Sequence, residues 1–234
     1  MISFVIPALN EETLITRCIS SIHKECEDWV NYEIIVVDNG STDNTVGLAL
    51  AQNALIVAEP NKGVTRARQA GLLAAHYNIV AFIDADNEIP PGWAVCAVWA
   101  LHYHNAIAAS GPVIYEELSI FKRIVISLFY TIAVVVHRVA PMIQGGNFIL
   151  RKDRMLEAGG FNTDIDFYGE DTDTAVRLSK IGKIRFEAGM WVYSSSRRIT
   201  EEGMVRIGLR YIINYAWMWL YGKPWTLKHF DHRT

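Results

Sequence analysis

Cysteines are scarce in this sequence, and their placement excludes the structures that cysteines commonly support. The 234 residues include three, Cys18, Cys26 and Cys96, which show no Cys-x-x-Cys spacing. Disulfide frameworks need paired cysteines and an oxidising compartment, and structural zinc sites need closely spaced Cys or His ligands. We therefore expect reduced core thiols in a cytoplasmic protein and no structural zinc.

Basic blocks and long hydrophobic segments are also missing. With a net charge of −3 and no Lys/Arg run, the chain lacks the surface that neutralises nucleic-acid phosphates, so we expect no nucleic-acid partner. The segment Met1–Pro7 lacks the features of a signal peptide and is predicted to be a strand. The apolar segment Ile124–Val136 has thirteen residues, fewer than the roughly 20 of a membrane-spanning helix, and none is predicted.

Apolar residues, in contrast, make up 51% of the chain, enough for the core of one large α/β domain or two small ones. Short apolar runs alternate with segments of helical periodicity, which predicts right-handed crossovers and a mostly parallel sheet. Asn10, followed by two glutamates, is expected to cap the first helix. The elements predicted in the first half are strands at 2–6, 33–38, 54–58 and 80–83 and further helices at 44–52 and 64–76.

Polar residues follow the ends of these strands. Pro7 ends the first strand, Asp38 the second, and Asp84 and Asp86 the fourth. Ligands of parallel α/β sheets bind beyond the carboxyl ends of the strands, so one crevice should collect these residues. Residues i and i+2 of an extended segment point to the same side, so Asp84 and Asp86 can face one hard cation such as Mg²⁺ or Mn²⁺. A solvated acidic turn is the alternative.

The second half contains one long apolar helix, predicted at 118–139. Lys122, Arg123, His137 and Arg138 flank its apolar centre. Burial in the core is one explanation for such a helix, and insertion at a membrane surface, where basic ends meet anionic lipid, is the other. The other elements predicted here are a helix after Trp93, a strand at 106–114, a helix after Glu170, a strand at 183–187 and a tail helix at 204–225.

Four ordered motifs connect the strand ends to a known family. They are Ile6-Pro-Ala-Leu-Asn-Glu11, Val37-Asp-Asn-Gly-Ser-Thr-Asp43, the segment 61–71 with Asn-x-Gly-x-x-x-Ala-Arg-x-x-Gly, and Asp84-Ala-Asp86. Together they resemble the inverting glycosyltransferases of family 2, which have the GT-A fold. The resemblance implies an α/β architecture of GT-A type, with a single Rossmann-like, mostly parallel sheet flanked by helices, a C-terminal acceptor-side subregion and a helical tail.

This resemblance also implies a division of the chain and a donor site. We expect a catalytic domain over 1–200, with a nucleotide-binding half at 1–90 and an acceptor-side half at 91–200, followed by a tail at 201–234. Asp84 and Asp86 would hold Mn²⁺ or Mg²⁺ and the donor. Asp38 would contact the base, and Arg68 would lie on the nucleotide side. The residues so assigned are Pro7, Leu9, Glu11, Asp38, Arg68, Asp84 and Asp86; where the family has a second acid after Asp38, this chain has Asn39.

Later motifs imply the acceptor side. The segments 144–151 and 159–161 precede Glu170-Asp171, and the order matches a family arrangement in which the aspartate is the catalytic base. The resemblance thus assigns Asp171 as the base and gives Glu170 an acceptor-side role. The alternative is that these acids only complement the dipole of the helix that follows.

Two adjacent arginines stand where the family often carries Gln-x-x-Arg-Trp. That motif is absent, and Arg197 and Arg198 resemble the paired arginines of smaller relatives, which implies that they clamp the diphosphate. A plain surface pair is the alternative.

These inferences predict an inverting glycosyltransferase that moves a sugar from a nucleotide-sugar donor to the hydroxyl of a carbohydrate or lipid-linked acceptor. A UDP-sugar is favoured because the Asp38 carboxylate suits a pyrimidine imide. The aromatic tail with nearby cations predicts peripheral contact with the inner face of the cell membrane. A sugar-phosphate nucleotidyltransferase would need a phosphate-cradling first loop, which residues 7–11 do not offer. A non-catalytic nucleotide-sugar-binding scaffold remains the other alternative, and donor hydrolysis would argue against it.

Overall fold

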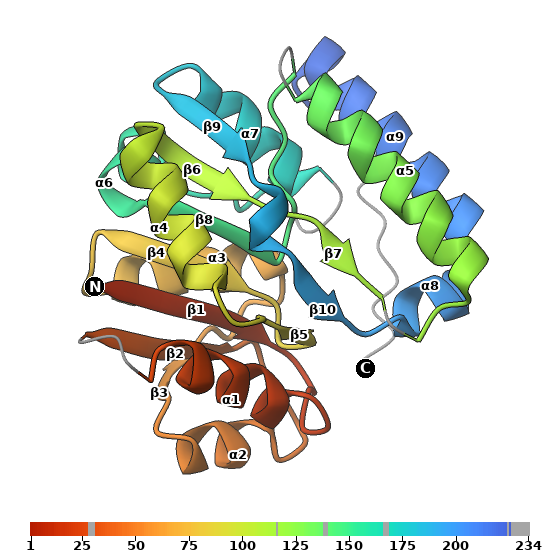
Figure 1. Ribbon diagram of the computed structural model, residues 1–234. Coiled ribbons are helices and arrows are strands. Elements are labelled where there is room, and N and C mark those ends of the chain that lie inside the picture. The colour runs from red at the N-terminus through yellow and green to blue at the C-terminus, as the bar shows by residue number, and fades with distance from the viewer. Residues whose placement is uncertain (28–30, 116, 138–139, 166–168, 224, 226–234) are drawn as a thin grey trace.

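A seven-stranded sheet forms the centre of the computed structural model, with the strand order β3-β2-β1-β4-β8-β6-β9 (Figure 1). All neighbours are parallel except β8, which runs antiparallel to both β4 and β6. The structure describes the chain apart from residues 28–30, 116, 138–139, 166–168, 224 and 226–234. The strands of this sheet are β1 (Ile2–Ala8), β2 (Tyr32–Asp38), β3 (Leu55–Ala58), β4 (Ile79–Ile83), β6 (Ala106–Ser110), β8 (Asn147–Arg151) and β9 (Lys183–Phe186).

Helices cover both faces of the sheet because its central strands are apolar on both sides. Along β1, Phe4 and Ile6 pack into one core cluster and Val5 into the other, as the two-residue alternation of a strand requires. The predicted alternation of strands and helices in the first half is confirmed. The helices are α1 (Ile15–Glu25), α2 (Thr45–Ala51), α3 (Val64–Ala74), α4 (Trp93–Tyr103), α5 (Ile120–Val136), α6 (Lys152–Glu157), α7 (Glu170–Ser179), α8 (Arg197–Glu202) and α9 (Met204–Tyr221), with a 3₁₀ turn at Ala188–Met190.

A second, three-stranded sheet was not predicted. It consists of β5 (Asn87–Glu88), β10 (Val192–Ser194) and β7 (Val113–Ile114). The prediction of a single strand at 106–114 is therefore wrong, because Gly111 and Pro112 separate β6 of the large sheet from β7 of the small one. A Cβ on Gly111 would collide with the backbone of Met190, and Pro112 has no N–H for a ladder.

Two details at the end of β1 also differ from expectation. Pro7 does not end the strand but continues in register with Val37 of β2, whereas the pairing with β4 stops at Val5. Because β1 no longer pairs with β4 at Pro7, the N–H that proline lacks is not needed for a ladder hydrogen bond on that side. Asn10 does not cap α1, which begins at Ile15. It has a φ of 52° and accepts a hydrogen bond from the Thr42 amide at 2.8 Å, joining the loops after β1 and β2.

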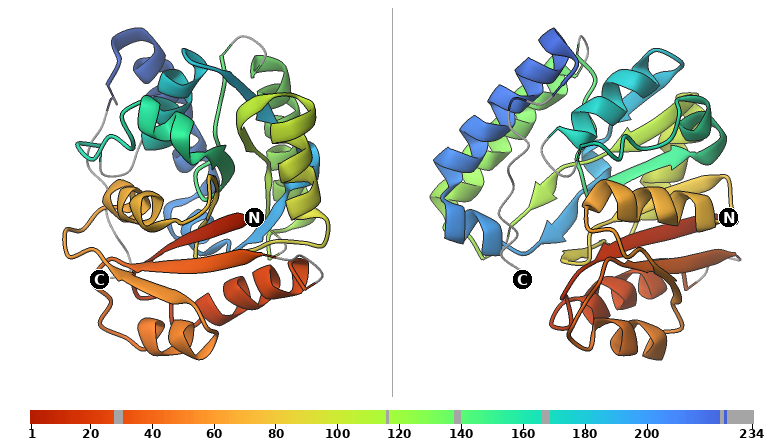
Figure 2. Two further views of the ribbon diagram at one scale, coloured as in Figure 1. Left: turned by 90° about the vertical axis from the view of Figure 1, so that its left-hand side faces the viewer. Right: turned by 180° about the vertical axis from the view of Figure 1, so that it is seen from behind.

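The long apolar helix predicted at 118–139 corresponds to α5. It is not buried in the core, so burial does not explain its apolar composition. Over α5 the side chains of Ile120 and Leu128 are 78% and 59% exposed. Helices α5 and α9 lie on the same flank of the molecule, away from β3 (Figure 2). The expected basic end at Arg138 lies outside the described residues. Among the residues described, no helix has both the length and the apolarity to cross a bilayer.

One buried side chain joins the two sheets. The Nδ2 of Asn147 lies 3.1, 3.2 and 2.7 Å from the carbonyl oxygens of Gly111, Pro112 and Met190, and its Oδ1 accepts a hydrogen bond from Trp93 Nε1 at 3.0 Å. Asn147 is fully buried. These contacts hold the start of β8 against the turn that separates β6 from β7.

We expect Asn147→Leu to lower the free energy of unfolding by at least about 2 kcal/mol, because buried carbonyls and an indole N–H lose their partner. Urea denaturation measures the change. Asn44→Leu is the matched control, since Asn44 is exposed and makes no side-chain cap at α2; it should change stability by less than about 0.5 kcal/mol. Equal losses in both variants would show that the buried contacts contribute nothing specific.

Candidate active site

The paired aspartates lie directly after β4, as predicted. The expected extended geometry is wrong, because Ala85 and Asp86 lie in a turn in which the Asn87 amide donates to the Asp84 carbonyl at 2.9 Å. Asp84 continues from Ile83, and its amide donates to the carbonyl of Gly146 at 3.0 Å. Gly146 has a φ of 75°, and a Cβ at this position would collide with the Asp84 carboxylate. A glycine is therefore required both by the backbone and by the close approach of the acid.

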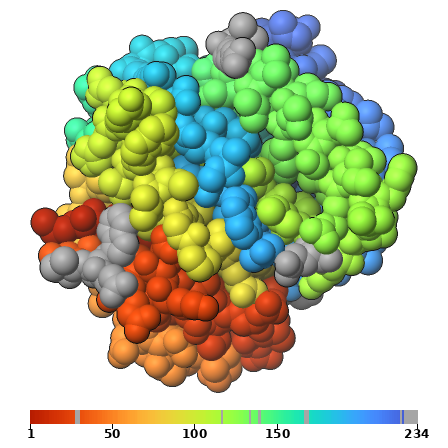
Figure 3. Space-filling view, in the orientation of Figure 1, coloured from red at the N-terminus to blue at the C-terminus, as the bar shows by residue number. Residues whose placement is uncertain are grey.

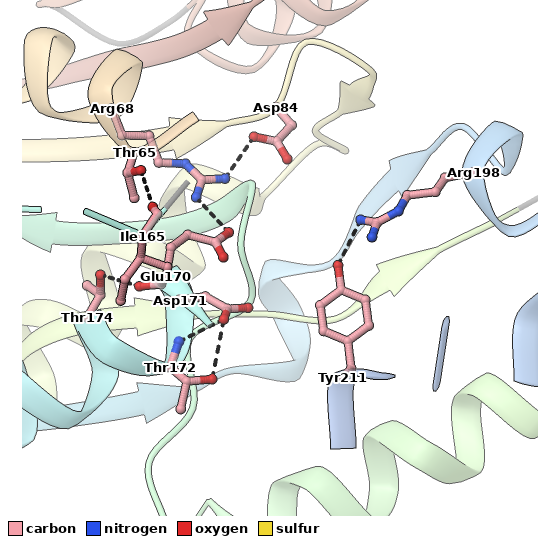
Figure 4. A network of polar contacts seen from close by, with 10 residues as sticks. All are labelled: Thr65, Arg68, Asp84, Ile165, Glu170, Asp171, Thr172, Thr174, Arg198 and Tyr211. Atoms are coloured by element: carbon pink, nitrogen blue, oxygen red, sulfur yellow. Dashed lines mark hydrogen bonds and ion pairs between the residues drawn. The ribbon is translucent and has the colours of Figure 1, made fainter. Parts of the chain in front are cut away.

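Arg68 connects this strand end to a distant helix. It projects from α3 and is buried, with Nη2 3.1 Å from Oδ1 of Asp84 and Nη1 3.2 Å from Oε1 of Glu170 (Figure 4). Its guanidinium also lies over the ring of Phe148, 5.7 Å from the centroid. The two carboxylates that Arg68 neutralises come from elements far apart in the sequence.

The acids of α7 sit at the first turn of that helix, which follows Gly169 with a φ of 93°. The Thr172 amide donates to Oδ1 of Asp171 at 2.7 Å, and the Thr172 hydroxyl lies 3.3 Å from the same oxygen. Burial raises the pKa of Asp171 despite these hydrogen bonds and the charge of Arg68. Burial, together with the charge of Asp171, raises the pKa of Glu170 to about 8, and Arg68 opposes this rise.

The raised pKa of Asp171 differs from what a helix N-terminus alone suggests. The dipole of α7 favours the ionised carboxylate, but the removal of this group from water has the larger effect. Burial therefore makes Asp171 more basic than an exposed aspartate.

Residues at the ends of β1 and β2 lie one and two strands away from β4. Pro7 and Leu9 are buried, and Asp38 is partly exposed with Oδ1 accepting from the Ser41 amide at 3.0 Å. Glu11 is buried and forms an ion pair with Arg197, whose Nη2 lies 3.0 Å from Oε1. One of the two predicted arginines thus reaches the loop after β1.

Asn39, the departure from the acidic motif, has a structural role. Its Nδ2 donates at 2.8 Å to the carbonyl oxygens of both Glu59 and Asn61, and its Oδ1 accepts from the Gly63 amide at 2.8 Å. An aspartate could not donate to those carbonyls. The amide therefore fastens the loop before α3, the helix that carries Arg68.

Tyr211 is a residue of this region that the sequence did not reveal. Its hydroxyl accepts from Nη1 of Arg198 at 3.0 Å, and the guanidinium also lies over its ring. Burial raises its pKa, and the nearby charges of Asp171 and Glu170 add to the rise while Arg198 opposes it. In Figure 4 the Asp171 carboxylate points toward the side on which Tyr211 and Arg198 lie. No local motif marks Tyr211, since only the fold brings α9 here.

A divalent cation fits the acids at the end of β4. Burial and then the charges of Asp86, Asp84, Glu88 and Glu11 raise the pKa of the Cys18 thiol, which donates to the Asp84 carbonyl at 3.6 Å. Within the described part of the chain, no three acids, histidines or cysteines form a complete metal site. Two carboxylates at a site of excess negative charge suit a hard cation that completes its coordination with phosphate oxygens and water.

Known sequences similar to this chain are glycosyltransferases. The family model described as Glycosyl transferase family 2 matches residues 3–156. An uncharacterized glycosyltransferase of Mycobacterium tuberculosis is 40% identical over 91 residues, which are 39% of this chain and 39% of that protein. The glucosyl-3-phosphoglycerate synthase of the same organism is 41% identical over 95 residues, covering 36% of this chain and 28% of that protein. The matched segments span less than half the length of these relatives.

Solved structures share the fold. A mannosyltransferase from Pyrobaculum calidifontis, in complex with GDP-Man and Mn²⁺, superposes with a TM-score of 0.75 at 22% identity, covering 95% of this chain and 65% of that chain. The Mycobacterium tuberculosis glucosyl-3-phosphoglycerate synthase, in complex with Mn²⁺, UDP-glucose and phosphoglyceric acid, gives 0.67 at 21% identity, covering 96% and 80%.

The raised pKa of Glu170 predicts a pH-dependent stability. Between the ordinary glutamate pKa and the raised one, the folded protein keeps a proton that the unfolded chain has lost. The free energy of unfolding should therefore fall as pH rises from about 5 to about 8, by at most about 1.4 kcal/mol per pH unit. Glu170→Gln removes this titration, so its stability relative to the wild type should increase over that range in urea denaturation. A constant difference would contradict the protonation of Glu170.

Proposed function

Because this chain belongs to glycosyl transferase family 2 and has the GT-A fold, we propose that it is a metal-dependent, inverting glycosyltransferase. It moves a sugar from a nucleotide-sugar donor to an acceptor hydroxyl. The observation that carries this proposal is the buried Arg68, which contacts the acid at the end of β4 and the acid beside Asp171. Donor-side and acceptor-side residues are thereby held together.

The donor lies at the ends of β1, β2 and β4 in this proposal. Asp38 accepts a hydrogen bond from the base, and the loop with Pro7, Leu9 and Glu11 packs beside it. We favour a UDP-sugar because the carboxylate of Asp38 matches the imide N–H of uracil. Similar proteins have been solved with UDP-glucose and with GDP-mannose, so the base requires a direct test.

Asp84 and Asp86 are the residues that would hold Mn²⁺ or Mg²⁺. When bound, such an ion neutralises the charge that develops on the diphosphate leaving group. Arg68 keeps Asp84 in position through the contact at 3.1 Å. Arg197, which forms an ion pair with Glu11, and Arg198, which donates to Tyr211, would contact the diphosphate by charge-assisted hydrogen bonds.

Asp171 accepts the proton of the acceptor hydroxyl. The hydrogen bonds from Thr172 fix the orientation of its carboxylate, and burial makes it more basic than an exposed aspartate. An acceptor oxygen that approaches from the Asp171 side attacks opposite the leaving diphosphate, which inverts the anomeric centre. Glu170 lines the acceptor side and stays bound to Arg68.

The division of the chain follows from these roles. Residues 1–90 form the nucleotide-binding half, residues 91–200 the acceptor-side half, and the segment from residue 201 a helical tail. The acceptor is the hydroxyl of a carbohydrate, free or attached to a lipid.

Asp171→Asn should lower turnover by about 10² to 10⁴-fold, the usual contribution of a general base. Affinity for the nucleoside diphosphate should stay within about twofold, because Asp171 contacts the acceptor and not the donor. Product formation and calorimetric titration measure the two quantities. Normal turnover in this variant would remove Asp171 from the base role.

Asp173→Asn is the matched control for that experiment. Asp173 lies in the same first turn of α7 but forms an ion pair with Arg177 at 2.7 Å. Its replacement changes the charge at the helix end without changing the proposed base, so turnover should remain within about an order of magnitude of wild type. Equal losses in both variants would indicate an effect of the helix terminus alone.

Calorimetry with nucleoside diphosphates tests the donor and the metal together. We expect UDP to bind more tightly than GDP in the presence of Mn²⁺, and chelation with EDTA to weaken UDP binding at least about tenfold. Asp86→Asn should abolish this metal dependence. Binding unaffected by EDTA would contradict the metal role, and a preference for GDP would contradict the proposed base.

A further inference from the structure

The outer side of α5 carries an exposed apolar stripe. Its side chains recur at helical spacing and therefore share one face. In a water-soluble domain such a face is normally buried against another element, and nothing among the described residues covers it. The members of the stripe, each at least 40% exposed, are Ile120, Phe121, Ile124, Val125, Leu128, Phe129, Ile132 and Val135.

Helix α9 has the same construction. Ile207, Asn214 and Met218 face the protein and are buried. The opposite side is apolar and exposed, and it ends in aromatic side chains. The exposed residues are Val205, Leu209, Ile212, Ile213, Trp219, Leu220 and Tyr221, followed by Trp225 after the helix.

Both stripes lie on one flank of the molecule. In Figures 1 and 2, α5 and α9 run in the same direction along the side farthest from α2. Figure 3 shows the green atoms of α5 forming the right-hand surface, with the blue atoms of α9 at its outer edge. The first turns of the two helices therefore lie at the same end of this flank.

The charged side chains within α5 and α9 have one sign, although Glu117 and Glu201 lie just before the two helices. The chain contains 25 Asp and Glu residues, yet neither α5 nor α9 has any. Lys122, Arg123 and Arg206 stand near the beginnings of the two helices. A wide apolar face with cations and exposed Trp and Tyr side chains matches a surface that offers both negative headgroups and hydrocarbon.

We propose that the outer faces of α5 and α9 bind the surface of an anionic lipid bilayer. The helices lie in the headgroup region with their apolar stripes inserted, and Lys122, Arg123 and Arg206 contact acidic headgroups. Tyr211 projects from the inner side of α9 to Arg198, near Asp171. The acceptor side of the site consequently opens beside the membrane, where a lipid-linked acceptor is presented; this last step rests on the proposed function.

Vesicle flotation with the full chain tests the proposal. We expect binding to vesicles of phosphatidylcholine with 30% phosphatidylglycerol, and at least about tenfold weaker binding to phosphatidylcholine alone. Leu128→Glu with Leu209→Glu should weaken binding to the anionic vesicles at least about tenfold, because each places a charge within the inserted stripe.

Leu73→Glu with Leu50→Glu is the matched control. Leu73 and Leu128 are both 59% exposed, and Leu50 and Leu209 are both 55% exposed, but the control pair lies on α3 and α2. The control variant should bind as the wild type does. Absence of wild-type binding, or equal losses in the two double variants, would overturn the proposal. A third outcome would also overturn it. If the wild type does not bind vesicles, and light scattering shows a dimer that dissociates only in the Leu128→Glu, Leu209→Glu variant, the flank is an interface between copies of the chain.

The result is separable from that for the catalytic site. Leu128→Glu with Leu209→Glu should keep wild-type affinity for UDP with Mn²⁺, whereas Asp86→Asn should lose metal-dependent UDP binding and still float with anionic vesicles. A protein that floats but does not bind any nucleoside diphosphate would refute the proposed function and leave the membrane surface standing. Loss of UDP affinity in the Leu128→Glu, Leu209→Glu variant would show general damage, and its weakened flotation would then count against the proposal.

Discussion

One buried cation, Arg68, holds together the region that we propose to be catalytic. Arg68 lies between the carboxylates of Asp84 and Glu170, which come from the end of β4 and the start of α7. Without it, acids from the two halves of the chain would face one another in a region of low dielectric, where like charges repel strongly. Burial raises the pKa values of Glu170 and Asp171, and the charge of Arg68 opposes the rise at both.

The neighbours of Arg68 are arranged to keep it in place. Asn39 fastens the loop from which α3 begins, and the glycine at position 146 allows Asp84 to approach without a side chain in between. The two sheets are joined at Asn147, the next residue after that glycine. The positions of the acids thus depend on neutral residues with specific backbone or amide chemistry.

Sequence patterns predicted much of this arrangement, and the family and the fold are confirmed. Short apolar runs that end in acids indicate strand ends directly, because both the apolar run and the acid are local features. Tyr211 could not be found in this way, since only the packing of α9 brings it to Arg198. The exposure of α5 was also beyond the sequence, because hydrophobicity measures preference for an apolar environment and does not say whether protein or lipid supplies it. The division of 106–114 between two sheets depended on a close contact with Met190, far along the chain.

The antiparallel strand β8 has a consequence for how the protein forms during synthesis. It lies between β4 and β6, although it follows both in the sequence. Until the ribosome has added residues 147–151, the inner edge of β4 has no partner and exposes unpaired backbone groups that can associate with other chains. Without β8, residues 1–90 would leave β4 as an edge strand of the sheet. The segment that closes this edge also carries Gly146 and Asn147, so the contacts of Asp84 and the junction of the two sheets depend on the same few residues.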